Sequence, residues 1–435
     1  MLISFSATNF RSIKEKQTID LTPASKYSSS KDSKNFANNL FNTGNKSAPE
    51  LLKSSAIYGA NASGKTNLIR AMHEFNAVAF GVNDDEDGIF DGTKKRVRGA
   101  SIPYQPFILD KESRNKPTEF EIDFIADDKN RYVYEFSFDA KKIHHEKLRK
   151  FIKNKEELIY KISNKKTFKA EFGKGFEGDK NKTLDILQNT ENNLFLPLNV
   201  NEDGNKFLNP IYDWIGEKLF IESGLHDNFS RTISWILKDK KNKEKLLNLL
   251  KEIDVGIEDL EISFIERKIP QSIEQDLQIP EEVKKRLRKF PIVKFISKIA
   301  KTPLQRNQIS DGTRSMFGSA SVIFPILESG GVLFFDELDN KLHPEILIKL
   351  VRMFHDPKIN KGNGQIVFTL HNDILLEKDY EIFRRDQVWF ASRDYKTGAS
   401  QYYSLVEFPD VKPRDNIVDR YRDYAFGARP ILKNS

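Results

Sequence analysis

The sequence predicts an α/β fold whose parallel sheet is assembled from both ends of the chain. The apolar residues 56–58 run into the glycine-rich stretch "GANASGKT" and then into the helix-like "NLIRAMHEF", which is a strand–loop–helix pattern. Three later segments, 331–337, 364–372 and 387–392, are continuously apolar. Strands that helices cover on both faces have this pattern, whereas half-buried strands alternate. The chain between these two groups is therefore expected to be an insertion.

The composition is that of a folded protein with a substantial core. The 435 residues suffice for two or three domains, and 31% of them are charged. No run of about 18 apolar residues occurs, so we expect no membrane partner. The start reads as a strand rather than a signal peptide, and cysteine is absent, so we expect a cytoplasmic protein without disulfides. The net charge of +7 permits an acidic partner, although most of these charges are expected to be solvated.

The first third of the chain is expected to alternate between strands and loops. Residues 2–22 contain two strand-like runs around the turn-like "RSIKEK". Residues 23–50, rich in Ser, Asn and Lys, read as a mobile loop, and the acidic stretch 81–92 reads as another surface loop. From 117 to 138, apolar and polar residues alternate on either side of "ADDKN", which predicts an antiparallel hairpin with one buried face.

The middle of the chain is expected to be a separate lobe. It begins strongly basic, and "NKEKLLNLLKEI" (242–253) has the leucine spacing of an amphipathic helix, followed by the strand-like "VGIEDLEISFIER". The lack of sustained heptads argues against a coiled-coil arm. We accordingly expect the first part of an α/β head (1–140), a basic, partly helical inserted lobe (141–300) and the second part of the head (301–435).

The stretch "GANASGKT" matches the phosphate-binding pattern G-x-x-x-x-G-K-[ST] in full. Such a loop turns backbone N–H groups toward a phosphate chain beside the positive end of a helix dipole. The lysine can reach the β- and γ-phosphates, and the following hydroxyl can bind Mg²⁺. The alternative is a glycine-rich turn that matches by chance. We expect a nucleotide site formed by Gly59, Asn61, Ala62, Ser63, Gly64, Lys65, Thr66 and Asn67.

Acidic residues end the first of the later apolar runs. "VLFFDELD" places Asp336 and Glu337 at the end of a buried strand. In a phosphate-loop protein the first acid at such a position holds the Mg²⁺ shell, and a second acid beside it can deprotonate the attacking water. An acid pair that merely ends a strand at the surface is the alternative.

Two more motifs bear on the subclass of protein. "QISDGTRSMFGSA" offers Ser310 and Gly312 at a helix start, where N–H groups and a hydroxyl can bind an anion. An ordinary helix cap would look the same. His371 follows the next buried strand, where a histidine is often only the polar end of the strand.

Taken in order, "NFRSI", "GANASGKTN", "ISDGTRSM", "FFDELDNKLHP" and "VFTLHN" resemble the motifs of ABC-type ATPases. Within that group the chain looks most like the branch related to OLD (overcoming lysogenization defect) proteins and to chromosome and recombination ATPases. The resemblance covers roughly residues 1–140 and 300–435. It implies an ABC-type P-loop ATPase head built from both chain ends, with a mixed helical and strand insertion.

The resemblance also implies how ATP and Mg²⁺ are held. ATP would lie between two subunits of a homodimer or higher oligomer. One subunit would supply Lys65 and Thr66, and the other would clasp the γ-phosphate with the Ser310 turn. Asp336 would be the metal acid, and Glu337 would be the base.

Five further residues receive roles from the resemblance. His371 would be the switch residue that senses the γ-phosphate, and Asp339 would lie in the loop that links the two sites, with His343 just behind it. Gln105 is the candidate for the glutamine that couples the metal to the helical region, and Arg11 for a basic residue that approaches the nucleotide. A plain structural role is the alternative for each. The tail "YAFGARP" also resembles a recurrent tail of these proteins, with packing as its expected role.

OLD proteins carry a Toprim nuclease after the ATPase, and the segment after His371 leaves no room for one. We therefore expect the ATPase subunit of a two-component system with a separately encoded effector nuclease. PARIS-like and Septu-like anti-phage systems have this arrangement, and a phage protein is the candidate trigger. This expectation rests on the resemblance rather than on particular residues.

The alternative function is that of a DNA-associated repair or chromosome ATPase. It is suggested by basic clusters that could bind DNA, for which a solvated helix face is the other interpretation. A nuclease hidden in the insertion is a third interpretation, without an acid–histidine constellation to support it. The clusters consist of Lys141, Lys142, Lys147, Arg149, Lys150 and Lys153, and of Lys284, Lys285, Arg286, Arg288 and Lys289.

Overall fold

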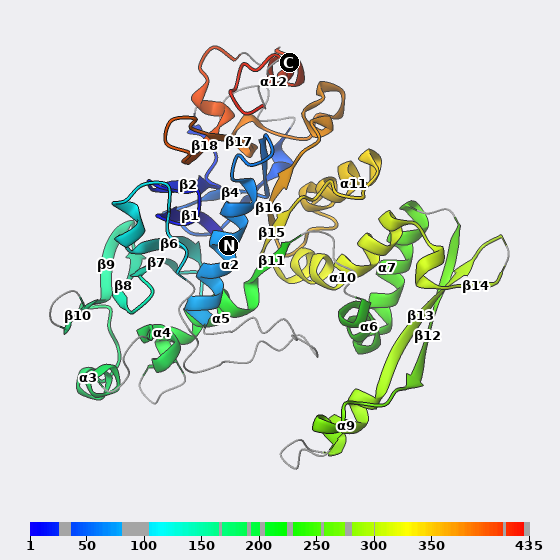
Figure 1. The fold of residues 1–435 in the computed structure, drawn as a ribbon, viewed down its shortest axis with the longest axis horizontal. Coiled ribbons are helices and arrows are strands. Elements are labelled where there is room, and N and C mark those ends of the chain that lie inside the picture. Colours follow the sequence, from blue (N-terminus) through cyan, green and yellow to red (C-terminus); the bar gives the residue numbers. More distant parts are fainter. Residues whose placement is uncertain are drawn as a thin grey trace.

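The computed structural model of the protein shows two large sheets and a projecting lobe (Figure 1). The loop predicted at 81–92 lies outside the residues that it describes. The described residues are 1–25, 36–80, 104–164, 168–188, 193–200, 205–223, 229–253, 256–274, 281–299, 301–411 and 415–429.

A six-stranded sheet forms the centre of the head. Its order is β11-β15-β16-β5-β17-β18, and only the pairing of β17 with β18 is antiparallel. The early strand β5 lies between two late strands, which confirms that both parts of the chain build one sheet. The strands are β5 (Ser54–Gly59), β11 (Leu219–Ser223), β15 (Val332–Asp336), β16 (Gln365–Leu370), β17 (Val388–Arg393) and β18 (Ser400–Ser404).

Strand β15 shows why the later runs are continuously apolar. Val332 and Phe334 belong to the core that includes α2, whereas Leu333 and Phe335 belong to the core that includes α10 and α11. Both faces of the strand are therefore covered. The helices are α2 (Lys65–Phe80), α10 (Asp311–Ser329) and α11 (Pro344–His355).

A second, antiparallel sheet of seven strands packs on the other side of α2. Phe75 of α2 lies 5.8 Å from Phe5 and 5.5 Å from Phe136, measured between ring centroids. The two strands predicted within 2–22 and the hairpin predicted at 117–138 are confirmed in this sheet. Its order is β10-β9-β8-β7-β6-β1-β2. The first four strands along the chain are β1 (Leu2–Thr8), β2 (Gln17–Asp20), β6 (Thr118–Ile125) and β7 (Arg131–Phe138).

The insertion is shorter than the sequence suggested. The basic stretch after residue 140 forms β8 (Ile143–Ile152), β9 (Lys155–Asn164) and β10 (Phe168–Phe172), which extend the second sheet. Strand β11 also falls within the predicted lobe, yet it pairs with β15 in the central sheet. The loop predicted at 23–50 is wrong in its second half, because β3 (Leu40–Asn42) pairs with β4 (Glu50–Leu52).

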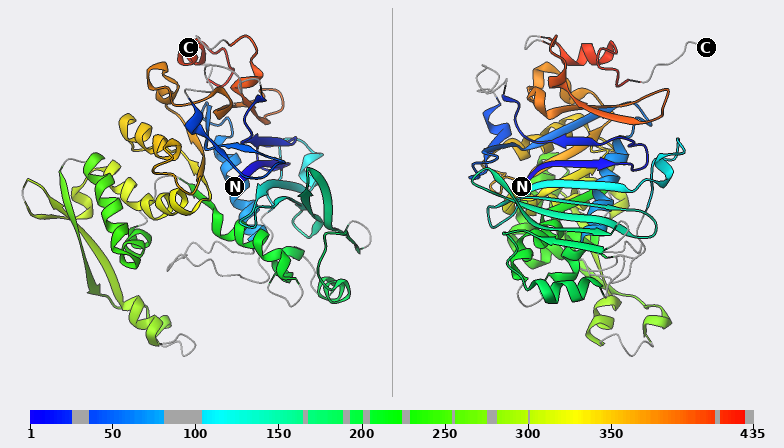
Figure 2. Two further views of the ribbon diagram at one scale, coloured as in Figure 1. Left: turned by 180° about the vertical axis from the view of Figure 1, so that it is seen from behind. Right: turned by 90° about the vertical axis from the view of Figure 1, so that its left-hand side faces the viewer.

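The remaining insertion projects from the head as a lobe (Figure 2). Helices α6 and α7 pack on α10, and the ribbon of β12 and β13 reaches away toward α8 and α9. The helix predicted at 242–253 and the strand after it are confirmed. The elements are α6 (Phe229–Lys238), α7 (Lys240–Ile253), β12 (Ile257–Glu266), α8 (Gln271–Glu274), α9 (Glu281–Arg288), β13 (Lys289–Ser297) and β14 (Pro303–Leu304).

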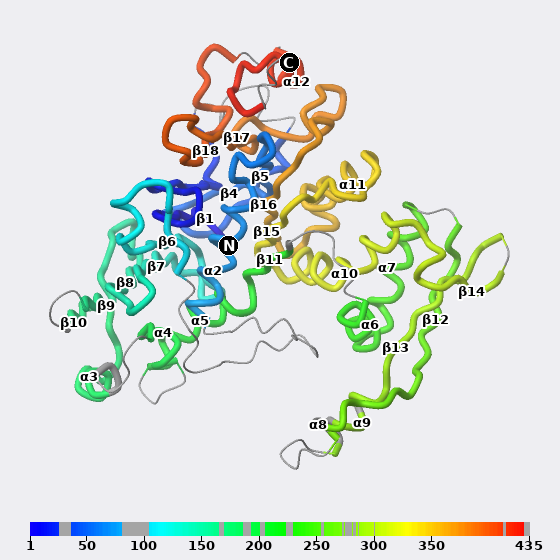
Figure 3. Tube along the Cα trace, in the orientation of Figure 1, coloured from blue at the N-terminus to red at the C-terminus, as the bar shows by residue number. Residues whose placement is uncertain are grey.

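Short helices complete the path of the chain that Figure 3 traces. The last of them, α12, lies beside the end of the central sheet near β17 and β18 (Figure 1). None of the helices in the described part of the chain is both long and apolar enough to cross a membrane. The helices are α3 (Lys180–Gln188), α4 (Phe195–Asn199), α5 (Asn209–Asp213) and α12 (Ile417–Arg422).

Candidate functional site

The candidate nucleotide loop joins β5 to α2. Because α2 begins at Lys65, the first N–H groups of the helix, which lack intrahelical acceptors, lie at this loop. Ala62 and Gly64 adopt positive φ angles of 64° and 106°. The Lys65 ammonium donates hydrogen bonds to the carbonyl oxygens of Gly59 (2.6 Å) and Ala60 (3.1 Å), so it lies folded back over the loop.

The charge of Lys65 interacts with the carboxylates at and just after the end of β15. Its side chain is buried, and burial lowers the pKa of the ammonium. The neighbouring Asp336, Asp339 and Glu337 act on this pKa in the opposite direction. The phosphate loop and the acids are thus brought together at the carboxyl ends of parallel strands.

A buried threonine fixes the two acids. Asp336 ends β15, and the Thr369 hydroxyl on β16 donates a hydrogen bond of 2.6 Å to its Oδ1 atom. The same hydroxyl oxygen accepts from the Glu337 N–H at 2.7 Å. Glu337 has a φ angle of 54°, a strained conformation for a residue other than glycine. Thr369 was not predicted; its signal in the sequence is a polar residue inside the apolar run "VFTLHN".

His371 lies against the second acid. Its Nε2 atom is 3.3 Å from Glu337 Oε1, and both side chains are about 40% exposed. The backbone N–H groups of His371 and Asn372 donate to Asp339 Oδ2 at 2.9 and 2.7 Å. Asp339 therefore fixes the loop after β16. His343 instead caps α11, where its Nδ1 atom accepts from the Glu345 N–H at 3.3 Å.

The phosphate loop is clamped from outside by residues that the sequence did not single out. The Tyr402 hydroxyl donates to the Gly64 carbonyl at 2.6 Å, and the Ser400 hydroxyl donates to the Ser63 carbonyl at 2.6 Å. Asn67 donates to the Ser12 hydroxyl at 2.6 Å. A Cβ atom on Gly64 would lie 2.1 Å from Ser400 Oγ, so this position has no room for a side chain.

We expect Tyr402→Phe to weaken ATP binding. The ring stays in the core, but the Gly64 carbonyl loses its donor, which costs about 1 kcal/mol, or roughly five-fold in affinity if the loop loosens. Tyr403→Phe is the matched control, because the Tyr403 hydroxyl donates to the Phe426 carbonyl instead. Titration calorimetry with ATP and Mg²⁺ compares the two variants. Equal affinities would mean that Tyr402 does not support the loop.

Arg11 and Gln105 are joined by a hydrogen bond between their main chains. The Arg11 N–H donates to the Gln105 carbonyl at 2.8 Å, and Arg11 has a positive φ angle of 50°. Burial lowers the pKa of the Arg11 guanidinium, and Arg70 acts in the same direction. The hydrogen bond to Arg11 involves the main chain of Gln105, and the role of the Gln105 side chain at the metal stays a prediction.

The Ser310 turn is built as a helix start. Ser310 is the N-cap of α10, and its hydroxyl accepts from the Thr313 N–H at 3.0 Å. A Cβ atom on Gly312 would make ordinary van der Waals contacts, 3.5 Å from the Lys341 carbonyl oxygen and 3.7 Å from Ile346 Cδ1. No clash with the described residues therefore requires glycine at this position. Its partners lie on the segment leading into α11, not on the phosphate loop.

The described residues fit an ATP phosphate chain and a magnesium ion. Among the described residues, Ser63 Oγ is buried without a hydrogen-bond partner, and the nearby Lys65 ammonium hydrogen-bonds only to carbonyls of the loop. In the described part of the chain, no group of three or more acidic or histidine side chains could hold a metal alone. Mg²⁺ commonly needs only one or two carboxylates besides phosphate oxygens, and Asp336 and Thr66 can serve in this way.

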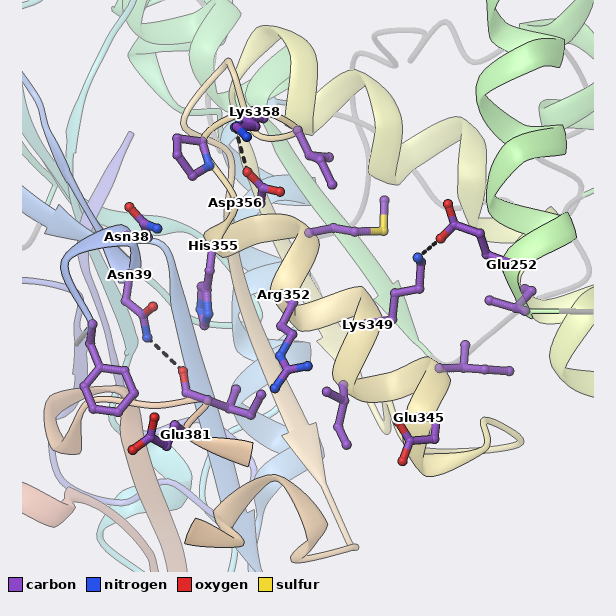
Figure 4. A pocket seen from close by; sticks show the side chains of 18 of the residues that line it. Asn38, Asn39, Glu252, Glu345, Lys349, Arg352, His355, Asp356, Lys358 and Glu381 are labelled. Atoms are coloured by element: carbon purple, nitrogen blue, oxygen red, sulfur yellow. Dashed lines mark hydrogen bonds and ion pairs between the residues drawn. The ribbon is translucent and has the colours of Figure 1, made fainter. Parts of the chain in front are cut away.

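The cavity of Figure 4 lies elsewhere, along α11. It measures about 980 Å³, and Arg352 points into its middle while Lys349 pairs with Glu252 at one end. His355 lines it too, and burial lowers the pKa of this histidine to about 3, so its ring is neutral. None of the residues expected to bind ATP lines this cavity, although the helix cap His343 does.

The fold and the site together define an α/β P-loop ATPase. The family described as "AAA domain, putative AbiEii toxin, Type IV TA system" matches residues 54–377. This is most of the chain, and the chain belongs to that family. ATP binding and an ATPase activity follow for the family in general. No curated protein sequence matches the chain.

Solved structures with a similar fold include heads of chromosome and repair ATPases. The Smc head bound to the C-winged helix domain of ScpA is 16% identical, with 93% of this chain and 97% of that chain covered and a TM-score of 0.40. The SMC head domain from Thermotoga maritima is 12% identical (93% and 98% covered, TM-score 0.38). The recombination mediator RecF with ATP is 14% identical (92% and 97% covered, TM-score 0.37). At these TM-scores the likeness carries no further argument.

Proposed function

We propose that this chain is a nucleotide-switched ATPase whose two copies close over ATP. It acts as the sensor subunit of a two-component bacterial anti-phage system with a separately encoded effector nuclease. The observation that supports the proposed ATPase activity is a cluster of four side chains. Lys65, the pair Asp336 and Glu337, and His371 meet at one edge of the sheet, with His371 Nε2 3.3 Å from Glu337 Oε1.

The geometry supports a division of labour among these residues. Lys65 neutralises the phosphates once its ammonium leaves the Gly59 carbonyl. Asp336 and Thr66 would hold Mg²⁺, which would supply charge neutralisation at the phosphates. Glu337, fixed at its backbone by Thr369, accepts the proton of the attacking water. The His371 side chain contacts the Glu337 carboxylate. In this proposal, that contact changes when His371 senses the γ-phosphate.

The pairing of two copies rests on the Ser310 turn. The first turn of α10, which Ser310 caps and which contains Gly312, presents N–H groups without intrahelical acceptors, and such a site favours an anion. Their contacts within the subunit leave the phosphate loop untouched. A second copy can therefore present this turn to the nucleotide bound by the first.

The defence role is supported by the description of the family, which names a putative toxin of a toxin–antitoxin system. It is tested with the native locus, including the neighbouring genes, in a bacterial host challenged with phage. We expect the wild-type locus to lower plaque numbers and Lys65→Ala to remove the protection. Lys16→Ala, which changes an exposed lysine paired with Glu121, is the control. Equal plaque numbers for the wild-type locus and an empty vector would refute the defence role.

The alternative, a DNA-associated ATPase, is weakened by how the basic clusters are used. Arg149 is paired with Glu121, Glu135 and Glu156, and Arg288 with Glu274 and Glu281. Lys284 is buried and donates to the Glu274 carbonyl at 2.7 Å. Within the described residues, both of these arginines are therefore neutralised by carboxylates of the chain, and Lys284 is withdrawn from the surface.

A salt series separates the two functions. We expect little affinity for duplex DNA at physiological ionic strength, and no steep change as salt is varied. A protein that binds DNA through these clusters would instead lose affinity by about 10³-fold or more between low and moderate salt. Fluorescence anisotropy with a labelled duplex measures this. Tight, steeply salt-dependent binding would favour the DNA-associated ATPase.

A further inference from the structure

The loop that follows β16 and carries His371 is held by two aspartate contacts, one on each side. On the inner side, Asp339 accepts the backbone N–H groups of His371 and Asn372. On the outer side, the next residue, Asp373, receives the Arg422 guanidinium in a two-pronged contact. Arg422 Nε lies 2.9 Å from Asp373 Oδ2, and Nη2 lies 2.9 Å from Oδ1.

The two-pronged contact fixes direction as well as distance. A guanidinium that binds both carboxylate oxygens holds the plane of the carboxylate, which a single hydrogen bond cannot do. The same Nη2 atom reaches Glu377 Oε1 at 3.3 Å, so Arg422 spans the loop from Asp373 to Glu377. The Arg422 side chain is 46% exposed and Asp373 is 20% exposed. The exposed ion pair between Arg422 and Asp373 therefore fixes the geometry of the loop but contributes little to the stability of the fold.

Arg422 sits on an element that is itself fixed to the sheet. Its neighbour on α12, Tyr421, stacks on Phe390 of β17 with 5.7 Å between ring centroids and meets Tyr58 edge-on at 5.9 Å. Tyr58 directly precedes Gly59, the first residue of the phosphate loop. Consecutive residues of α12 thus contact the strand that leads into the phosphate loop and the loop that carries the switch histidine.

We propose that Arg422 is a positioning residue of the ATP site, which holds His371 in register with Glu337 through Asp373. This inference rests on the proposed function, because it needs His371 to act in hydrolysis. It gives α12 a role in the chemistry, for which the sequence offered no prediction. A 1 Å displacement of a group near the reacting atoms can cost up to about 10²-fold in rate.

The test compares two arginines of the same helix in the full-length protein. Arg422→Ala removes the contact with Asp373. Arg420→Ala is the matched control, because Arg420 pairs with Asp410 and Asp415 and does not touch the loop. We expect Arg422→Ala to lower kcat for ATP hydrolysis by about ten-fold with little change in KM, since the Lys65 loop is intact. Arg420→Ala should leave both constants near wild type.

Two further variants separate positioning from a general loss of structure. Arg422→Asp combined with Asp373→Arg should recover part of kcat, because the pair is restored in reverse. Arg422→Ala added to His371→Ala should lower kcat no further than His371→Ala alone, since both act through one group.

The possible outcomes distinguish a failure of the positioning role of Arg422 from a failure of the proposed ATPase function. If the wild type hydrolyses ATP and His371→Ala is impaired, but Arg422→Ala matches Arg420→Ala, the positioning role is refuted and the ATPase stands. If the losses of the two single variants multiply in the double variant, Arg422 acts independently of His371 and the inference is also overturned. If the wild type does not hydrolyse ATP, the proposed function itself fails.

Discussion

Glu337→Gln is expected to bind ATP and remain closed as a dimer, with hydrolysis slowed about 10²- to 10⁴-fold. Glutamine keeps the size of the side chain and can still contact His371 and Asn340, but it cannot accept a proton. The left-handed backbone at Glu337 is held by Thr369 through the main chain, so the substitution leaves it in place. Lys65, Thr66 and Asp336 are unchanged, and nucleotide binding should survive.

Light scattering with and without ATP and Mg²⁺ measures the closed state. The wild type should dimerise only transiently, whereas Glu337→Gln should accumulate the dimer. Adding Ser310→Arg should abolish it, because an arginine at the helix cap fills the space that the partner's phosphate would occupy. Ser329→Arg is the matched control, since Ser329 is an exposed serine at the other end of α10.

Two results would contradict this mechanism. Wild-type hydrolysis by Glu337→Gln would mean that another group accepts the proton. A dimer that forms equally without ATP, or equally with Ser310→Arg and Ser329→Arg, would mean that the nucleotide does not join the two copies.

The central sheet could be predicted because its strands carry a strong local signal. A strand such as β15, buried on both faces, has to be apolar at every position, and that pattern is visible without knowledge of its neighbours. The phosphate loop is equally local. Its conformation depends on adjacent glycines and on a following helix, so the motif predicts its own geometry.

The second sheet was predicted only in part, because charged residues that pair across its later strands obscure the apolar–polar alternation of a strand. Arg149 on β8 forms ion pairs with Glu135 on β7 and Glu121 on β6, so a strand of the sheet reads as a solvated basic run. In a neighbouring position Glu146 is buried and bound by the Tyr134 and Tyr160 hydroxyls. Such charges become satisfied only when strands meet, and one sequence does not show which strands meet.

The supports of the candidate site were missed for a related reason. Ser400 and Tyr402 reach the phosphate loop from the last strand of the sheet, and Arg422 reaches the switch loop from the last helix. Each is an ordinary residue for its own element. Their importance lies in long-range contacts, which no local pattern encodes.

Lys65→Ala is expected to remove most ATP binding while the protein stays folded. The phosphates lose their nearest cation, and loss of a charge-assisted hydrogen bond costs about 1.5–3 kcal/mol, or roughly 10- to 150-fold in affinity. Burial already disfavours the charged ammonium in the free protein, as the lowered pKa of Lys65 shows. Removing that charge should therefore not unfold the free protein, even though hydrogen bonds to Gly59 and Ala60 are lost.

Thermal unfolding with and without nucleotide tests both halves of this prediction. A ligand at 100 times its Kd stabilises the folded state by about 2.7 kcal/mol, so Mg·ATP should raise the Tm of the wild type and of Lys16→Ala, an exposed-lysine control. Lys65→Ala should have a Tm near wild type without nucleotide and no rise with it. A normal rise would show that "GANASGKT" is only a turn. A low Tm without nucleotide would show instead that Lys65 serves the fold, because the hydrogen bonds to the loop would then outweigh the cost of burying its charge.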